Sequence, residues 1–144
     1  MNIRENIPIS TLTTMRLGGP AKFVIEIESA EECTEAFEFV KEKGLPFYFL
    51  GAGANSLGLD AGFDGALIIN KIKGIEVLQE SENEFTVKVA GGEIWDDFVQ
   101  FVVGHNFSGV EAMSKIPGTV AAAPVQNIGA YGQEAKDTIA KVEV

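Results

Sequence analysis

The chain has 144 residues, of which 46% are apolar and 22% charged, so it can bury the core of a compact domain. Its 21 acidic and 11 basic residues give a formal net charge of −10, which disfavours binding to nucleic acid or an anionic membrane surface. A single cysteine and a single histidine exclude an intramolecular disulfide and a Cys/His metal cluster. No apolar run approaches the roughly 20 residues that span a bilayer, and the chain does not begin with a signal-peptide pattern, so we expect a cytoplasmic protein.

The N-terminal part of the sequence predicts a surface segment, a loop and a strand. Residues 1–12 are mixed in composition and are expected to lie over the surface. A loop should follow over residues 13–20, in which we expect Arg16 to make a salt bridge or hold a carbonyl rather than contact a ligand. Apolar residues alternate over 21–27, which predicts a strand with one buried face.

A helix and a second strand are predicted next. Ser29 and Glu32 have the spacing of a capping box and predict a helix from that point to about Lys43. The residues expected on the inward face of this helix are Cys33, Ala36, Phe37 and Val40. Residues 47–50 predict a short strand, and the strand, helix, strand order predicts a parallel βαβ unit with a right-handed crossover.

A glycine-rich loop follows that strand directly, at the position where ligands bind in parallel sheets. Its sequence is Gly51-Ala52-Gly53-Ala54-Asn55-Ser56. Serine at position 56, and the lack of an acidic residue about 20 positions later, disfavour a Rossmann dinucleotide fingerprint. Successive backbone N–H groups could still hold a pyrophosphate, with Gly51 and Gly53 permitting the positive φ or close approach that this requires, and a simple turn is the alternative.

The second half of the sequence predicts a mainly antiparallel unit. A strand over 65–69 and a turn at 71–74 lead to an antiparallel hairpin formed by residues 76–78 and 85–89. Residues 93–103 predict a helix whose acidic first turn suits the helix dipole.

Three further features of this half are less regular. Trp95 is expected to be a core anchor rather than a stacking partner for a ligand. His105 follows the helix, and because no carboxylate or nucleophile is placed to act with it, we assign it no role. A helical turn is predicted within residues 108–113, and alternation over 138–144 predicts a strand.

Residues 114–132 fit neither an ordinary helix nor an ordinary strand. Pro117-Gly118 marks a turn, small residues fill most of the next positions, and Pro124 interrupts them. Exposed backbone and the amides of Gln126 and Asn127 could wrap a flat or phosphorylated ligand, whereas an alanine run alone would equally fit a packed helix. The amide-rich, glycine-rich end of the segment favours ligand binding.

Several motifs together resemble the UDP-N-acetylenolpyruvoylglucosamine reductase family of bacterial peptidoglycan synthesis. The main one is Ile116-Pro117-Gly118-Thr119-Val120 followed by Ala123-Pro124-Val125-Gln126-Asn127-Ile128-Gly129-Ala130-Tyr131-Gly132. The resemblance extends to residues 13–21, 50–57 and 90–95 and so covers essentially the whole chain.

The resemblance implies an α+β fold of the type shared by vanillyl-alcohol oxidase and the peptidoglycan reductases, incomplete at its C-terminus. It implies a small α/β FAD-binding subdomain over residues 1–74, the first part of a second α+β FAD-binding subdomain over 75–144, and a substrate domain absent from this sequence. It also implies noncovalent FAD, NADPH as reductant, and reduction of the enolpyruvyl ether of UDP-N-acetylglucosamine to UDP-N-acetylmuramate. No feature of the sequence sets the oligomeric state.

Residues of two segments are implied in cofactor binding by the same resemblance. Those expected to hold the pyrophosphate are Gly51, Ala52, Gly53, Ala54, Asn55, Ser56 and Leu57. Those expected to line the pyrophosphate, ribityl chain and isoalloxazine are Ile116, Pro117, Gly118, Thr119, Ala122, Ala123, Gln126, Asn127, Gly129, Ala130 and Tyr131. The family usually has Ser in place of Ala54 and often Gly in place of Ala121.

No catalytic residue can be assigned by the resemblance, since the family's arginine, serine and glutamate would lie beyond Val144. We therefore expect this chain alone to be inactive. One alternative is a shortened, non-catalytic flavin- or nucleotide-binding or interaction module of the same fold. A second is a related flavin oxidase, which would usually need a covalent attachment residue that neither His105 nor Cys33 supplies within these motifs.

Overall fold

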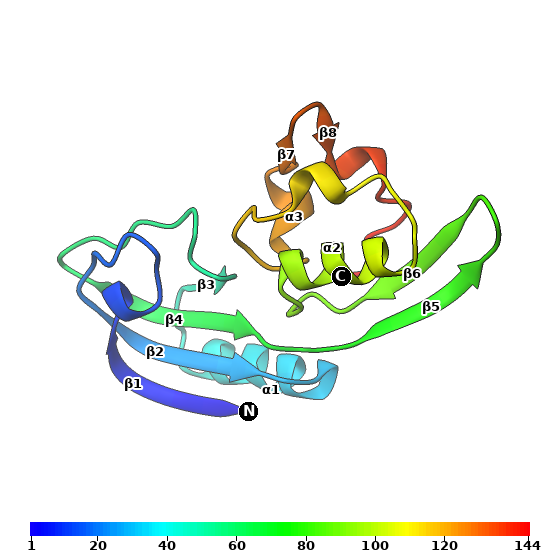
Figure 1. Cartoon of the computed structure of the whole chain (residues 1–144). Coiled ribbons are helices and arrows are strands. Elements are labelled where there is room, and N and C mark those ends of the chain that lie inside the picture. The colour runs from blue at the N-terminus through cyan, green and yellow to red at the C-terminus, as the bar shows by residue number, and fades with distance from the viewer. The chain divides into compact units, whose positions relative to one another are not determined.

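The computed structural model describes residues 1–144 and shows a mixed α+β chain (Figure 1). The chain divides into two compact units, Met1–Ile72 and Lys73–Val144. Each unit has its own core, and the two are described separately below. No helix in the structure is both long and apolar enough to cross a membrane.

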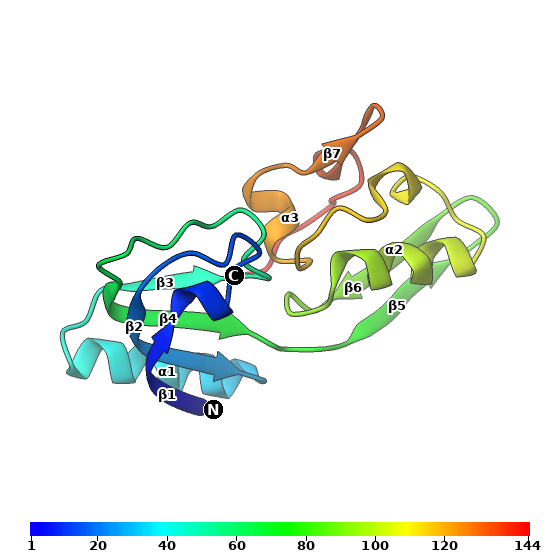
Figure 2. The ribbon, with the colours of Figure 1, turned by 60° about the vertical axis from the view of Figure 1, so that its left-hand side comes forward.

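The first unit is a four-stranded sheet with one helix against it (Figure 2). Its elements are β1 (Asn2–Pro8), β2 (Pro20–Ile27), α1 (Ala30–Glu42), β3 (Phe47–Leu50) and β4 (Phe63–Asn70). The strand order is β1-β2-β4-β3, with β1 antiparallel to β2 and both β2 and β3 parallel to β4. The predicted parallel arrangement of β2 and β3 around a helix is therefore confirmed, with β4 lying between them.

The central strands β2 and β4 have buried residues on both faces of the sheet. On one face, Phe23, Ile25 and Ile27 form a core with α1, as the alternation predicted. On the other, Val24 and Ile9 belong to a second buried cluster. The expectation that residues 1–12 only lie over the surface is wrong, because β1 pairs with β2 and a 3₁₀ turn (Ile9–Thr11) places Ile9 in that second core.

Helix α1 begins with the predicted cap. Ser29 Oγ accepts a hydrogen bond from the Glu32 N–H at 3.2 Å. The Glu32 carboxylate accepts the N–H of Glu28 at 2.7 Å, one residue before the position that a regular capping box would use. Phe37 is 40% exposed, so its predicted inward position is wrong, and Phe39 packs against the core instead.

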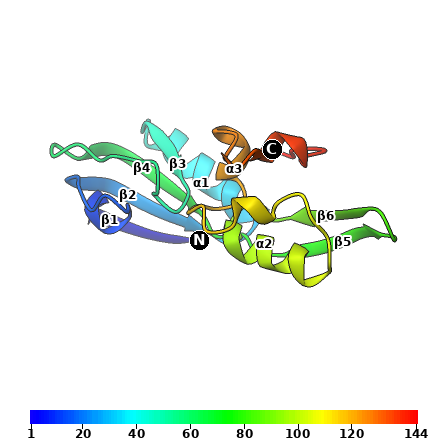
Figure 3. The same cartoon turned by 45° about the horizontal axis from the view of Figure 1, so that its top comes forward.

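The second unit combines a hairpin with short helical segments (Figures 1 and 3). Its longer elements are β5 (Ile75–Glu80), β6 (Phe85–Val89) and α2 (Trp95–Gly104). Its short elements are 3₁₀ turns at Glu111–Met113 and Ala135–Asp137, α3 (Ala122–Val125), β7 (Gly129–Ala130) and β8 (Gln133–Glu134). The predicted antiparallel hairpin is confirmed by the β5–β6 pairing, and residues from α2, Phe85 of β6 and the later segments share one core.

Three expectations for this half need correction. Residues 71–74 form an irregular connection rather than a turn. Helix α2 begins at Trp95, two residues later than predicted, because Gly91–Ile94 are occupied by hydrogen bonds to residues 119–121. Residues 139–144 have no regular structure, since they find no strand to pair with, and the predicted strand over 138–144 is wrong.

Candidate functional site

The glycine-rich loop of the first unit follows β3, as expected. Backbone contacts with residues 12–14 hold it in place. The N–H of Thr14 donates to the carbonyl of Gly53 at 3.1 Å. Gly53 is buried with φ +68°, and a Cβ at this position would lie 2.1 Å from the Leu12 carbonyl oxygen. Only glycine fits such a position, because both the left-handed φ and the contact exclude a side chain. Gly53 therefore adopts the positive φ expected for it, and in this structure it lets the backbone of Leu12 and Thr13 approach closely.

Two side chains of the segment beside this loop lack partners within the protein. Thr13 is 7% exposed, and its Oγ1 is buried without a hydrogen-bond partner. A buried hydroxyl of this kind costs free energy unless another group satisfies it. Arg16 adopts φ +54°, and its side chain makes neither the salt bridge nor the carbonyl contact expected for it.

In the second unit, residues 113–121 are bonded along the start of α2. Ala121 donates to the Gly91 carbonyl at 3.0 Å and Val120 to the Glu93 carbonyl at 2.9 Å. The N–H of Trp95 donates to the Gly118 carbonyl at 3.1 Å, which satisfies one of the free N–H groups at the helix N-terminus. The motif 90–95 thus serves as the surface against which the small-residue segment runs.

Two side chains of α2 complete this attachment. Trp95 is 4% exposed and its Nε1–H donates to the Met113 carbonyl at 3.0 Å, so its predicted role as a core anchor is confirmed. Asp96 accepts from the N–H of Lys115 at 2.8 Å, from Ser114 Oγ at 2.7 Å and from Lys115 Nζ at 2.6 Å.

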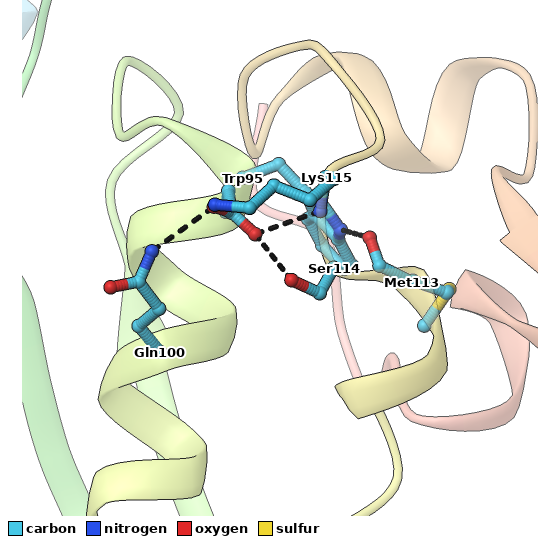
Figure 4. A network of polar contacts seen from close by, with 6 residues as sticks. Trp95, Gln100, Met113, Ser114 and Lys115 are labelled. Carbon is cyan, nitrogen blue, oxygen red and sulfur yellow. Dashed lines mark hydrogen bonds and ion pairs between the residues drawn. The ribbon is translucent and has the colours of Figure 1, made fainter.

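Gln100 adds a fourth contact to the Asp96 carboxylate at 3.0 Å (Figure 4). Hydrogen bonds from the Lys115 side chain and backbone, followed by that from Ser114, hold the pKa of Asp96 well below its usual range. Asp96 also raises the pKa of Lys115. Sequence reasoning assigned Asp96 only a favourable place near the helix dipole, and no motif connects it to residues 18 and 19 positions later.

The remainder of the segment forms a short helix and a tight hairpin. Helix α3 has 4 residues, so the alternative of a long packed alanine helix does not hold. Strands β7 and β8 pair antiparallel, joined by Tyr131 at φ +51° and Gly132 at φ +89°. Two consecutive positive φ values mark a type I′ turn, which a tyrosine rarely occupies. The turn holds the Tyr131 side chain 96% exposed.

Some predicted site residues use their polar atoms within the fold, whereas others lie beside open space. Asn127 has φ +45°, and its Oδ1 accepts the N–H of Lys136 at 2.9 Å, so this oxygen serves the fold. Thr119 is 8% exposed, whereas Gly118 has φ +151° with open space where a Cβ would stand. The structure brings residues 116–131 together in the second unit and residues 51–57 together in the first.

The lone histidine packs against aromatic rings and does not join the acidic residues in a metal-binding group. His105 Nδ1 lies 2.8 Å from the Phe101 carbonyl oxygen, and its ring stacks on Phe85 with centroids 5.1 Å apart. It lies at the C-terminal end of α2, whereas residues 113–121 are bonded near the N-terminal end. No group of three or more His, Cys, Asp and Glu residues could hold a metal ion.

Comparison with known proteins defines the class to which this chain belongs. A family model described as an FAD binding domain matches residues 21–144. The chain belongs to this family of FAD-binding domains, whose cofactor is FAD. Within the first unit the Thr13 hydroxyl is buried without a partner, and within the second unit Gly118 leaves open space beside the backbone.

The individual relatives are UDP-N-acetylenolpyruvoylglucosamine reductases. The one from Salinispora arenicola is 38% identical over 136 residues, which are 94% of this chain and 38% of the relative. The one from Photobacterium profundum is 35% identical over 144 residues, which are 100% of this chain and 41% of the relative. The crystal structure of the Thermus caldophilus enzyme matches with a TM-score of 0.72 and 28% identity, over 92% of this chain and 46% of that one. This chain thus spans less than half the length of each.

Proposed function

We propose that this chain is the FAD-binding portion of an NADPH-dependent reductase that converts UDP-N-acetylglucosamine enolpyruvate to UDP-N-acetylmuramate. The observation that carries the proposal is the similarity of 35–38% identity to reductases of this name along almost the entire chain. The proposal assigns residues 1–74 and 75–144 to two FAD-binding subdomains. The proposal also includes a role in peptidoglycan synthesis and a cytoplasmic location.

The proposed cofactor contacts are the residues of the two segments described above. Backbone N–H groups of residues 51–57 would hold the pyrophosphate, and residues 116–131 would line the pyrophosphate, ribityl chain and isoalloxazine. Bound FAD would supply the hydride chemistry, while the protein binds and orients it. The positive φ of Asn127 and Tyr131 supports this assignment, since strained backbone is retained at ligand sites.

FAD would be held without a covalent bond. Covalent attachment to His105 is disfavoured because its ring is stacked on Phe85 and its Nδ1 contacts a backbone carbonyl. The Thr13 hydroxyl is a further candidate contact, since it is buried beside Gly53 without a partner. Its role would be to donate to or accept from a polar group of the cofactor.

A flavin titration tests the binding part of the proposal. Purified protein titrated with FAD should quench or polarise flavin fluorescence, and denaturation should release all of the flavin. Riboflavin, which lacks the pyrophosphate, should bind more weakly. Absence of FAD binding up to high micromolar concentration would refute the proposal.

A turnover assay tests the catalytic part. We expect the 144-residue chain with saturating FAD, NADPH and the enolpyruvyl UDP-sugar to give no measurable sugar reduction. A positioned proton donor contributes about 10²–10⁴ in rate, and the resemblance assigns none to this chain. Turnover at an enzyme-like rate by this polypeptide alone would contradict the assignment.

A further inference from the structure

We infer that Asp96 is a positioning residue of the flavin-binding segment: its carboxylate fixes Ser114 and Lys115 and thereby sets the course of residues 116–121. The inference rests on the proposed function for its consequence in FAD binding. The attachment itself is a property of the second unit and can be tested without any ligand.

The contacts of Asp96 are concentrated on one point of the chain. Of the four groups that donate to its carboxylate, three belong to Ser114 and Lys115 and one to Gln100. Figure 4 shows these donors converging on the same carboxylate beside the Trp95–Met113 hydrogen bond. Charge-assisted hydrogen bonds to a backbone N–H fix the geometry of that peptide more strongly than neutral ones do.

The backbone at this point requires such a restraint. Lys115 has φ +66°, a conformation that costs a residue with a Cβ about 1 kcal/mol or more. It is followed directly by Ile116-Pro117-Gly118, the start of the segment proposed to line FAD. The Asp96 bond to the Lys115 N–H therefore acts at the residue where the chain direction is set.

The neighbouring Asp97 provides a matched comparison. It carries the same charge in the same helix turn, but its side chain makes no hydrogen bond or ion pair in the structure. Replacing either residue by Asn removes one negative charge near the N-terminus of α2. Only Asp96→Asn weakens the attachment of Ser114 and Lys115: the amide oxygen can still accept from Ser114 Oγ and the Lys115 N–H but without the charge, and the NH₂ group cannot accept from Lys115 Nζ or Gln100.

Amide hydrogen exchange tests the attachment directly. The N–H groups of Val120 and Ala121 are bonded to Glu93 and Gly91, and they report whether the segment stays in place. We expect Asp96→Asn to raise their exchange rates by about tenfold or more relative to Asp97→Asn, because local opening becomes easier. Equal exchange in the two variants would overturn the inference, whatever the outcome of the FAD titration.

Flavin affinity then tests the functional consequence. If the wild-type chain binds FAD, Asp96→Asn should weaken binding by about fivefold to tenfold while Asp97→Asn stays within about twofold. Lys115→Gly in the Asp96→Asn background should recover part of the lost affinity, because glycine adopts the positive φ without strain. Urea denaturation of the same variants shows whether affinity follows global stability, and an affinity loss fully accounted for by stability would contradict the positioning role.

A milder variant covers the case in which Asp96→Asn fails to fold. Ser114→Ala removes one donor from an exposed residue and leaves the other bonds to Asp96 in place. It should raise the exchange of Val120 and Ala121 by about twofold to fivefold. No change in exchange would contradict the role of the Asp96 contacts. Failure of the wild-type chain to bind FAD would refute the proposed function alone.

Discussion

The two segments proposed to hold FAD are kept in shape by different means. The loop at residues 51–57 is fixed by backbone against backbone, with Gly53 pressed against Leu12. The segment at residues 116–131 also has backbone hydrogen bonds, but its start is attached in addition by the side chains of Trp95 and Asp96. The first loop is therefore sensitive to any added atom, whereas the second is sensitive to the loss of particular polar groups elsewhere in the chain.

The largest effect is expected at Gly53. Gly53→Ala would place a Cβ 2.1 Å from the Leu12 carbonyl oxygen at an unfavourable φ, so we expect a loss of about 2–4 kcal/mol in the free energy of unfolding. Gly104→Ala is the control, since no atom lies within 4 Å of that position. It should be neutral or stabilising by up to about 1 kcal/mol in helix α2. Urea denaturation measures both, and equal stability of the two variants would contradict the account of this loop.

A smaller loss is expected at the anchor of the second segment. Trp95→Phe removes the hydrogen bond to the Met113 carbonyl and part of a buried ring, which should cost about 1–2 kcal/mol. Phe98→Leu alters the same core without touching that hydrogen bond. If the anchor matters for the segment, only Trp95→Phe should speed amide exchange at Val120. Equal amide exchange at Val120 in both variants would show that Trp95 acts only through packing.

The pH dependence of stability should distinguish Asp96 from Asp97. The pKa of Asp96 is lowered in the folded state below the ordinary value of 3.8, mainly by its bonds to Lys115. Its contribution to stability is therefore present above about pH 4 and is lost as the pH falls through the folded-state pKa.

Thermal unfolding midpoints measured at several pH values test this contribution of Asp96 to stability. The difference between wild type and Asp96→Asn should be constant near neutral pH and shrink below pH 3.8, the unfolded value. Asp97→Asn should lie close to wild type throughout. A wild-type to Asp96→Asn difference that persists undiminished at pH 2 would show that the carboxylate's charge is not responsible.

The smallest effect, and one of opposite sign, is expected at Thr13. Thr13→Val keeps the shape of the side chain and removes a buried hydroxyl without a partner, so the free energy of unfolding should be unchanged or rise by up to about 1 kcal/mol. FAD affinity should fall a few-fold if the hydroxyl contacts the cofactor. If Thr13→Val raises stability and leaves FAD affinity unchanged, the hydroxyl does not contact the cofactor. Thr13 would then not belong to the proposed site.

Local sequence patterns determined most of the secondary structure. The alternation over 21–27, the cap at Ser29 and the apolar run at 47–50 each specify an element through interactions within a few residues, and the structure contains all three. The position of the glycine-rich loop after a parallel strand followed from the same short-range patterns. The family resemblance located both candidate segments because their small residues form long and specific motifs.

Tertiary structure decided the features that depend on residues far apart in the chain. The alternation over 138–144 gives no strand, because a strand forms only where another strand is available to pair with it. Phe37 and Phe39 both lie on α1, and contact with Phe23 selected Phe39 for the core. The tight fit of Gly53 against Leu12, and the hold of Asp96 on Ser114 and Lys115, join segments that no local pattern connects. A sequence indicates which side chains can donate, accept or pack, but only the folded chain brings their partners within bonding distance.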